Sequence, residues 1–421
     1  MAVDSTQATG GRRLFSSFQL RDFRLLWLAS LGFSGGMWVQ QVAIGWLVLQ
    51  MNGTALDLGA VQAARMLPSL LFGMVAGVLA DRLPRRELLM GIGAVSALYS
   101  IVLAWLIAVG GLEFWHIIAL TFIFGSCRAF EWPVAQALIY DVVGPAEALR
   151  GISLNGTASR LMGVVAGVAG GAVIPTFGPQ GSLVLMAAGY ALGVVLLLFL
   201  HPPTQAPRGV SAPSFGESLR HGYALARSNR RLLGLFVLSC FGEVFAFSHM
   251  TLVPLFARDV LHAGPEGLGL LTSARALGSV ASSLLLASLA HQRAGVPLLV
   301  AHYAIYGAAL IGLALSSNLW VSIGLMAAIG LAASSLDLLQ QTLMQLSVPD
   351  ADRGRAVGYW VAALGFGPVG HLEIGLLGTL LGAPLAMAMN GAIVLVVFGV
   401  AVVVIRRGRH GKATAASEAP A

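Results

Sequence analysis

Apolar runs that are long enough to cross a membrane recur along the whole chain of 421 residues. A helix rises about 1.5 Å per residue, so roughly 20 apolar residues span a hydrocarbon layer of about 30 Å. Only 10% of the residues are charged, against about 25% in a soluble domain. We therefore predict an all-α membrane protein with twelve transmembrane helices near residues 25–51, 57–80, 88–109, 115–140, 152–175, 181–200, 233–257, 266–290, 297–316, 319–346, 356–380 and 384–405.

A long polar stretch divides these runs into two sets of six. We predict an N-terminal bundle at 1–201, a cytoplasmic linker at 202–231, a C-terminal bundle at 232–408 and a disordered tail at 409–421. Residues 214–231 read equally well as an amphipathic surface helix or as an ordinary connection. The decapeptides beginning at Leu58 and Leu268, LGAVQAARML and LGLLTSARAL, indicate an internal repeat. Paired bundles of this kind build many secondary transporters, with the substrate cavity between them.

The basic residues fix the expected orientation. With the N-terminus inside, the arginines and lysines between the runs fall on the inner face, except Arg258. Cytoplasmic loops carry such an excess of positive charge. Both termini are therefore expected in the cytoplasm, and the formal net charge of +7 reflects topology, so no nucleic-acid partner is expected. The first run is too long for a cleaved signal peptide.

Charges follow the second run abruptly, at Asp81, Arg82, Arg85 and Arg86, with Gly77 four residues before the first of them. This pattern resembles the Gly-x-x-x-Asp-Arg-x-x-Arg-Arg signature of the major facilitator superfamily, on the cytoplasmic loop between helices 2 and 3. Pro84 stands where the family usually has glycine. The resemblance implies a carrier in the inner membrane that is usually driven by the proton gradient.

One branch of that superfamily, which exports macrolides and siderophores such as enterobactin, is similar over nearly the whole chain. The similar tracts include the first eighty residues, GPAEALRGISLNGTASRLMG after the fourth run and VPDADRGRAVGYW after the tenth. We expect a proton-linked exporter of amphipathic small molecules, such as drugs or siderophores. The alternatives are an importer, a flippase for a lipid-like substrate, and a transport-inactive sensor or scaffold.

Other chemistries find little support in the sequence. It contains no nucleotide-binding loop, metal cluster or catalytic triad, so we expect no enzyme, no cofactor and no metal. Cys127 and Cys240 lie in apolar runs and predict no disulfide framework. The expected partners are a small-molecule substrate, protons and the lipid bilayer, and the expected state is a monomer.

Ionisable residues within the runs are candidates for the mechanism, because each costs roughly 2.5–3.5 kcal/mol to insert unless it faces a partner or water. Four of each sign suggest internal pairing: Arg65, Arg128, Arg160, Arg275, Glu131, Glu243, Asp337 and Glu373. Arg128 and Glu131 share a helix face, and Arg128 resembles the arginine that the family links to proton transfer.

Each of these groups has a functional and a structural interpretation. Glu131 and Asp337 are the leading proton carriers, and a static ion pair is the alternative. Glu243 and Glu373 either attract a cationic substrate or make buried hydrogen bonds; His371 lies too close to Glu373 in sequence to share its face. The outer-side Arg65 and Arg275 are either gate or anion-binding groups, or packing groups.

Three further features concern the gate and the packing. Asp81 is expected to contact the start of helix 11 near Arg353 and Gly354, with Arg86 or Arg355 adding ion pairs, and so to latch the inner side. Gly163, Gly167 and Gly171 share one face of helix 5 and favour close packing, where the family's exporters often carry Gly-Pro-x-x-Gly-Gly. Trp38 and Trp132 either line an apolar cavity or pack in the core.

Overall fold

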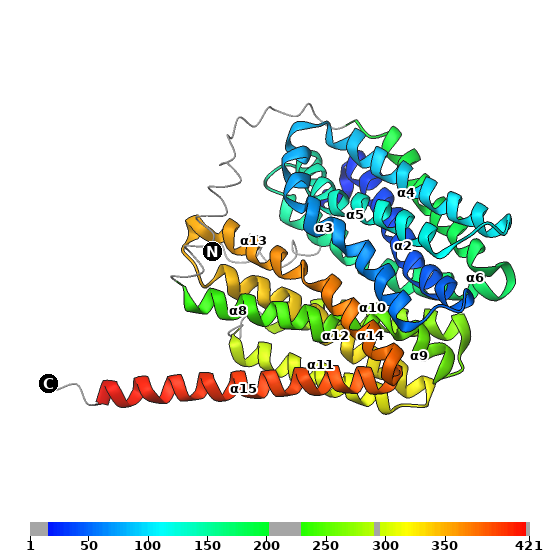
Figure 1. Ribbon diagram of the computed structural model, residues 1–421. Coiled ribbons are helices and arrows are strands. Elements are labelled where there is room, and N and C mark those ends of the chain that lie inside the picture. Colours follow the sequence, from blue (N-terminus) through cyan, green and yellow to red (C-terminus); the bar gives the residue numbers. More distant parts are fainter. Residues whose placement is uncertain (1–15, 202–228, 290–294, 418–421) are drawn as a thin grey trace, which may run out of the picture.

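The computed structural model describes residues 16–201, 229–289 and 295–417, with side chains except at 73–82, 287–289, 351 and 401–417. All regular structure in these ranges is helical, which confirms the predicted all-α class. The helices form two groups that follow the chain: α2 to α6 lie together, and α8 to α15 lie together beside them (Figure 1). The residues around 202–228, where a surface helix was one expectation, lie outside the described ranges.

The first group contains one short turn and five helices. One helix, α6, is 51 residues long, or about 76 Å if straight, which is far more than one crossing. Gly178 interrupts it with φ 68° between Pro175 and Pro179, a left-handed backbone that favours glycine. The expected runs 152–175 and 181–200 therefore lie on its two arms. The bounds are η1 (Ser16–Gln19), α2 (Arg21–Gln50), α3 (Ala55–Arg82), α4 (Arg85–Ala108), α5 (Phe114–Val143) and α6 (Ala148–Leu198).

The second group is less regular than its sequence predicts. The expected seventh helix is broken into α8 (Arg230–Phe241), the π turn η2 (Gly242–Ala246), the 3-10 turn η3 (Phe247–Thr251) and α9 (Val253–Asp259). The break frees the carbonyl of Ala246, which accepts a hydrogen bond of 2.8 Å from the Tyr306 hydroxyl. The remaining elements are α10 (Gly264–Leu289), α11 (Val296–Leu315), α12 (Leu319–Gln345), η4 (Asp350–Asp352), α13 (Arg353–Leu364), α14 (Gly367–Leu381) and α15 (Ala383–Ser417).

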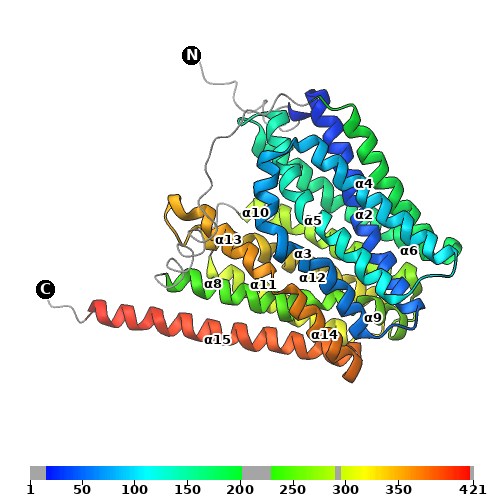
Figure 2. The same cartoon turned by 45° about the horizontal axis from the view of Figure 1, so that its top comes forward.

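The last helix runs into the segment that was expected to be a tail. A disordered tail was predicted from residue 409, yet α15 continues to Ser417 and extends beyond its group toward the C-terminus (Figure 2). The alanines of this segment favour helix.

Nine stretches of the described chain are long and apolar enough to cross a membrane, and α6, the run from α8 to α9 and the run from α13 to α14 count as one stretch each. The total of twelve crossings therefore stays a prediction, as do the domain boundaries. Two hydrophobic cores underlie the groups. One is built from α2 to α6 around Phe23, Phe124 and Tyr190, and the other mainly from α8 to α15 around Phe256, Tyr303 and Tyr306.

The two groups share one packing arrangement. Gly125 of α5 lies against the carbonyl of Arg65 on α3, and Gly330 of α12 lies against the carbonyl of Arg275 on α10, both too closely for a Cβ atom. Arg65 and Arg275 occupy matching positions of the repeated decapeptide. The sequence repeat therefore corresponds to a repeated helix crossing.

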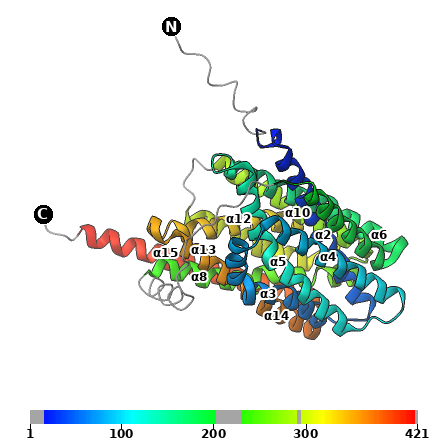
Figure 3. The ribbon, with the colours of Figure 1, turned by 90° about the horizontal axis from the view of Figure 1, so that it is seen from above.

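The groups touch each other along α3 and α14, and along α6 and α10 (Figure 3). The three glycines of α6 lie on this seam: Gly163 faces Trp38 and Ala276, Gly167 faces Gly269 and Ser273, and Gly171 faces Pro265 and Gly269. Gly156, two turns nearer the start of α6, has no neighbour from the second group within 4 Å of where a Cβ would lie. The groups therefore separate toward the start of α6.

At the end of the seam that lies away from Gly156, the second group contacts the residues on either side of the turn between α2 and α3. Arg258 donates a hydrogen bond of 3.2 Å from Nη1 to the carbonyl of Leu49, near the end of α2. The Leu56 amide, at the start of α3, donates a bond of 2.9 Å to the Thr379 hydroxyl of α14. Both helix ends thus receive a partner from the second group, which closes this end of the molecule.

Candidate functional site

A pocket of about 230 Å³ lies between α2, α5 and the first arm of α6, and we call it the polar pocket. It sits where the two groups begin to separate, near Gly156. Phe33 and Trp132 supply its aromatic surface. Its charged and amide side chains are Arg128, Glu131, Gln136, Asn155 and Arg160.

Arg128 and Glu131 form an ion pair in this pocket. Nη1 of Arg128 lies 2.5 Å from Oε1 of Glu131, one helical turn further along α5. The other carboxylate oxygen, Oε2, is buried without a hydrogen-bond partner among the described residues. The two side chains share one face, as their spacing predicted, and half of the Glu131 carboxylate is available to another partner.

Arg160 and Asp337 connect the two groups of helices electrostatically. Arg160 lines the polar pocket from α6 and interacts with the charge of Asp337 on α12, which also interacts with Arg275 on α10. Within the described side chains, neither Arg160 nor Asp337 makes a direct ion pair. Asp337 therefore interacts electrostatically with an arginine of each half.

Glu243 is a second acid of the C-terminal half. It lies buried in the π turn η2, beside the start of α14, because a Cβ on Gly367 would be 3.6 Å from its Oε2. It interacts electrostatically with Asp337. No hydrogen bond to its carboxylate is found in the part of the chain that the structure describes. The irregular turn thus places an unpaired acid near the second candidate proton carrier.

Glu373 has a different environment. Nδ2 of Asn390, on α15, donates a hydrogen bond of 3.1 Å to its Oε2. His371, two residues earlier, contacts the Thr251 hydroxyl at 2.7 Å and the Met66 sulfur at 3.1 Å. The two side chains point to different neighbours, and the contact of Glu373 is a partly buried hydrogen bond.

The two arginines that were expected on the outer side have different surroundings, and so do the two tryptophans. Arg65 donates from Nε to Oε1 of Gln62 at 2.9 Å, whereas Nε of Arg275 is buried without a hydrogen-bond partner in the described structure. Trp38 packs on Gly163 of α6. Trp132 lines the polar pocket and is 61% exposed.

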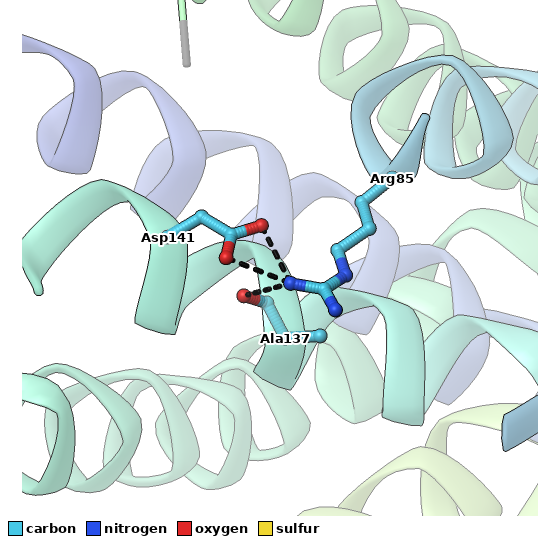
Figure 4. Close-up of polar contacts among 3 residues, drawn as sticks. All are labelled: Arg85, Ala137 and Asp141. Carbon is cyan, nitrogen blue, oxygen red and sulfur yellow. Dashed lines mark hydrogen bonds and ion pairs between the residues drawn. The ribbon is translucent and has the colours of Figure 1, made fainter. Parts of the chain in front are cut away.

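The charged motif is engaged within its own half. Nη1 of Arg85 lies 2.7 Å from both carboxylate oxygens of Asp141, at the end of α5, and 3.5 Å from the Ala137 carbonyl (Figure 4). The two side chains are only 5% and 15% exposed. The sequence reasoning missed Asp141, although a lone acid at the end of an apolar run, on the same expected face as the motif, is a detectable signal.

Arg86 or Arg355 was expected to add an ion pair to Asp81, and that expectation stays a prediction because the Asp81 side chain lies outside the described residues. Among the described residues, both arginines have partners. Arg86 donates to the carbonyls of Leu197 and Leu198 at 2.8 Å each, and Arg355 pairs with Asp352. Carbonyls at a helix end lack internal partners and attract cations, which explains where Arg86 binds. The side chains of Gly77, Asp81 and Arg82 lie outside the described residues.

Two packed groups of apolar helices, with a polar pocket and buried charged residues near their junction, are typical of a membrane transporter. The chain belongs to the major facilitator superfamily: the family described as transmembrane secretion effector matches residues 13–420. The resemblance of the Gly77–Arg86 motif is thereby confirmed at the level of the family.

Curated relatives are named for siderophores and macrolides. The chain is 23% identical to a staphyloferrin A transporter of Staphylococcus aureus over 80% of this chain and 84% of the relative. It is 26% identical to an enterobactin exporter of Shigella flexneri, covering 79% and 78%. It is 22% identical to macrolide efflux protein A of Streptococcus pyogenes, covering 75% and 79%.

Solved structures share the fold at low identity. A nucleoside transporter, NupG, superposes with a TM-score of 0.72 at 14% identity, over 90% of this chain and 98% of that one. A bacterial homologue of the lysosomal transporter Spinster, in an inward-facing and unoccupied conformation, gives a TM-score of 0.67 at 15% identity over 95% and 96%. These structures show that the chain shares its fold with solved transporters.

Proposed function

We propose that this protein is a proton-coupled exporter of amphipathic small molecules, with drugs and siderophores as the candidate classes. It works by alternating access as a monomer in the inner membrane, with both termini in the cytoplasm. The relatives that are named as an enterobactin exporter and a macrolide efflux protein support this direction of transport.

The observation that carries the proposal is the half-satisfied Glu131 carboxylate in the polar pocket. Its Oε1 is paired with Arg128 and its Oε2 has no partner among the described side chains. A proton can bind Glu131 when Arg128 moves away and leave when Arg128 returns. Asp337 is the corresponding acid of the other half, with Arg160 and Arg275 as its mobile counter-charges.

The separation of the groups suggests which state is described. They meet at the α2–α3 turn and part toward the start of α6. With the orientation that the basic residues predict, the pocket opens to the cytoplasm. We infer an inward-open state, in which the inner latch is released.

The latch closes when Asp81 meets the start of α13. The N-cap residue of that helix, Asp352, makes no side-chain capping bond, so the first amides of α13 are free of that partner. A helix N-terminus favours a carboxylate. We propose that Asp81 occupies this position in the outward-open state.

Transport into inside-out vesicles under an imposed pH gradient tests the function. Wild-type protein should accumulate members of a panel of drugs and siderophores, and a protonophore should abolish the accumulation. Glu131→Gln and Asp337→Asn should each lose pH-driven uptake. Normal pH-driven uptake by both variants would refute the coupling role, and accumulation only in right-side-out vesicles would instead support import.

Flipping of a lipid-like substrate is the second candidate function. An apolar groove of about 610 Å³ lies between α2 and both arms of α6, and its walls include Gly32, Gly35, Val165 and Leu192. Such a groove suits an acyl chain. Transfer of a fluorescent phospholipid between leaflets, without drug accumulation in vesicles, would favour this function over export.

A further inference from the structure

The polar pocket contains one positive charge without a direct partner. Arg128 is neutralised by Glu131 at 2.5 Å, which leaves Arg160 as the other charged wall of the pocket. Arg160 makes no hydrogen bond or ion pair with any side chain that the structure describes. Its interaction with Asp337 is electrostatic only. A guanidinium within a membrane span is expected to face a partner or water, and here it faces the pocket.

Two amides beside Arg160 are also unsatisfied. Oε1 of Gln136, from α5, and Oδ1 of Asn155, from α6, are buried without hydrogen-bond partners in the described residues. Both side chains line the pocket. An amide offers both a donor and an acceptor, and burying such groups without partners is unfavourable. Hydroxyl or amide groups of a ligand would satisfy both.

The pocket also has an aromatic wall. Trp132 lies one turn from Gln136 on α5, so the two side chains share a face, and Trp132 is 61% exposed. Phe33 lines the pocket from α2. Flat apolar groups pack well on such rings.

Resting on the proposed function, we infer that the polar pocket is the recognition subsite for organic anions that carry a flat apolar part. Arg160 binds the carboxylate through its two-pronged guanidinium. Gln136 and Asn155 bind neighbouring hydroxyl or amide groups, and Trp132 contacts the ring. Arg160 is thus the residue that determines specificity for the charge of the substrate.

This assignment connects binding to the other half of the protein. Arg160 is shared between the pocket and Asp337 of α12. A bound carboxylate competes with Asp337 for the same guanidinium, so occupancy of the N-terminal half weakens an electrostatic link to the C-terminal half. Removing the Asp337 charge should therefore strengthen anion binding.

Salicylate is a suitable probe, because it combines a carboxylate, a hydroxyl and an aromatic ring. We would measure its binding to the full chain in nanodiscs by scintillation proximity, with salicylamide and benzylammonium as neutral and cationic competitors. Wild-type protein should bind salicylate, and neither competitor should displace it at equal concentration. Arg160→Gln should weaken binding by at least about tenfold, since it removes a charged hydrogen-bond partner.

Arg150→Gln is the matched control, because it removes an arginine from the same helix whose partner, Glu147, lies outside the pocket. It should bind salicylate like wild type. Asp337→Asn should bind about two- to threefold more tightly, through loss of the competing charge. This gain cannot come from a misfolded protein, so it tests the site even if Arg160→Gln fails to fold.

Several outcomes would overturn the inference. Unchanged salicylate binding in Arg160→Gln would exclude Arg160 as the anchor. If benzylammonium displaced bound salicylate, and Glu131→Gln abolished that displacement, the pocket would be a cation site instead. If the protein bound no salicylate but still accumulated drugs in inside-out vesicles, only the anion subsite would be refuted. If it bound salicylate but transported nothing in vesicles, only the export function would be refuted.

Discussion

The two halves of the protein share a scaffold and differ in their chemistry. Gly125 against Arg65 and Gly330 against Arg275 form the same crossing in each half. Yet in the N-terminal half Arg128 forms a direct ion pair with Glu131. Asp337 of the C-terminal half makes no ion pair with a described side chain, and it interacts with Arg275 and Arg160 only electrostatically. Duplicated halves can thus keep a backbone crossing that packing demands while the charged groups diverge.

The loops after the repeated helices diverge in the same way. The N-terminal copy ends in DRLPRR, and the C-terminal copy has HQRAG at the corresponding place. In the first half, Arg85 and Arg86 bind the ends of α5 and α6. The first half needs the basic pair because Arg85 and Arg86 bind the ends of two of its own helices.

The largest effect is expected at the shared crossing. Gly125→Leu and Gly330→Leu each force a side chain into the backbone of the facing helix, since even a Cβ has no room there. Both variants should fail to yield monodisperse protein in detergent, as measured by size-exclusion chromatography. Gly324→Leu, on the same helix as Gly330 but with open space at its Cβ, should behave like wild type. Failure of only one crossing variant would break the equivalence of the halves.

The next effect concerns the nearly buried pair Arg85–Asp141 of the first half, which has no counterpart among the ion pairs described in the second half. Arg85→Gln leaves Asp141 nearly buried without its counter-charge, which costs about 3–5 kcal/mol. Thermal unfolding in detergent should show a large loss of stability. Arg353→Gln breaks an exposed pair with Asp350 and should cost at most about 1 kcal/mol. Equal losses in the two variants would contradict a special role for Arg85.

A smaller effect is expected at the latch. Asp81→Asn removes the carboxylate that we propose for the start of α13, and the variant should insert normally but turn over more slowly. A charge at a helix N-terminus contributes about 0.3–1 kcal/mol, so turnover should fall only a few-fold. Vesicle uptake compared at equal protein content measures it. Wild-type turnover would rule out the latch.

The sequence predicted the elements that depend on apolar length and charge placement. The all-α class, the repeat and the shared face of Arg128 and Glu131 follow from periodicity. The π turn at Gly242–Ala246 could not be predicted, because it depends on Tyr306 of another helix reaching the Ala246 carbonyl. The roles of Gly125 and Gly330 were equally hidden, since nothing in either helix alone shows where a neighbouring backbone passes.

The sequence predicted which residues could form the candidate site, but it did not predict which residues of different helices interact with each other. Every intramembrane charge could be counted, yet Arg160 received no role because the residues around it come from α2, α5 and α12. Asp141 was missed because its partner, Arg85, lies 56 residues away in sequence. Charges within one helix turn can be paired from sequence, whereas pairs between helices need the fold.

The smallest effect separates the two remaining acids of the C-terminal half. Glu373→Gln keeps an oxygen that can accept from Asn390, so both pH-driven transport and unfolding temperature should stay near wild type. Glu243→Gln removes the titratable carboxylate of a buried acid that interacts electrostatically with Asp337 and should change the pH dependence of transport in vesicles. If Glu373→Gln altered that dependence and Glu243→Gln did not, the acid in the π turn would be the structural one, and the proton route would run along α14 and α15.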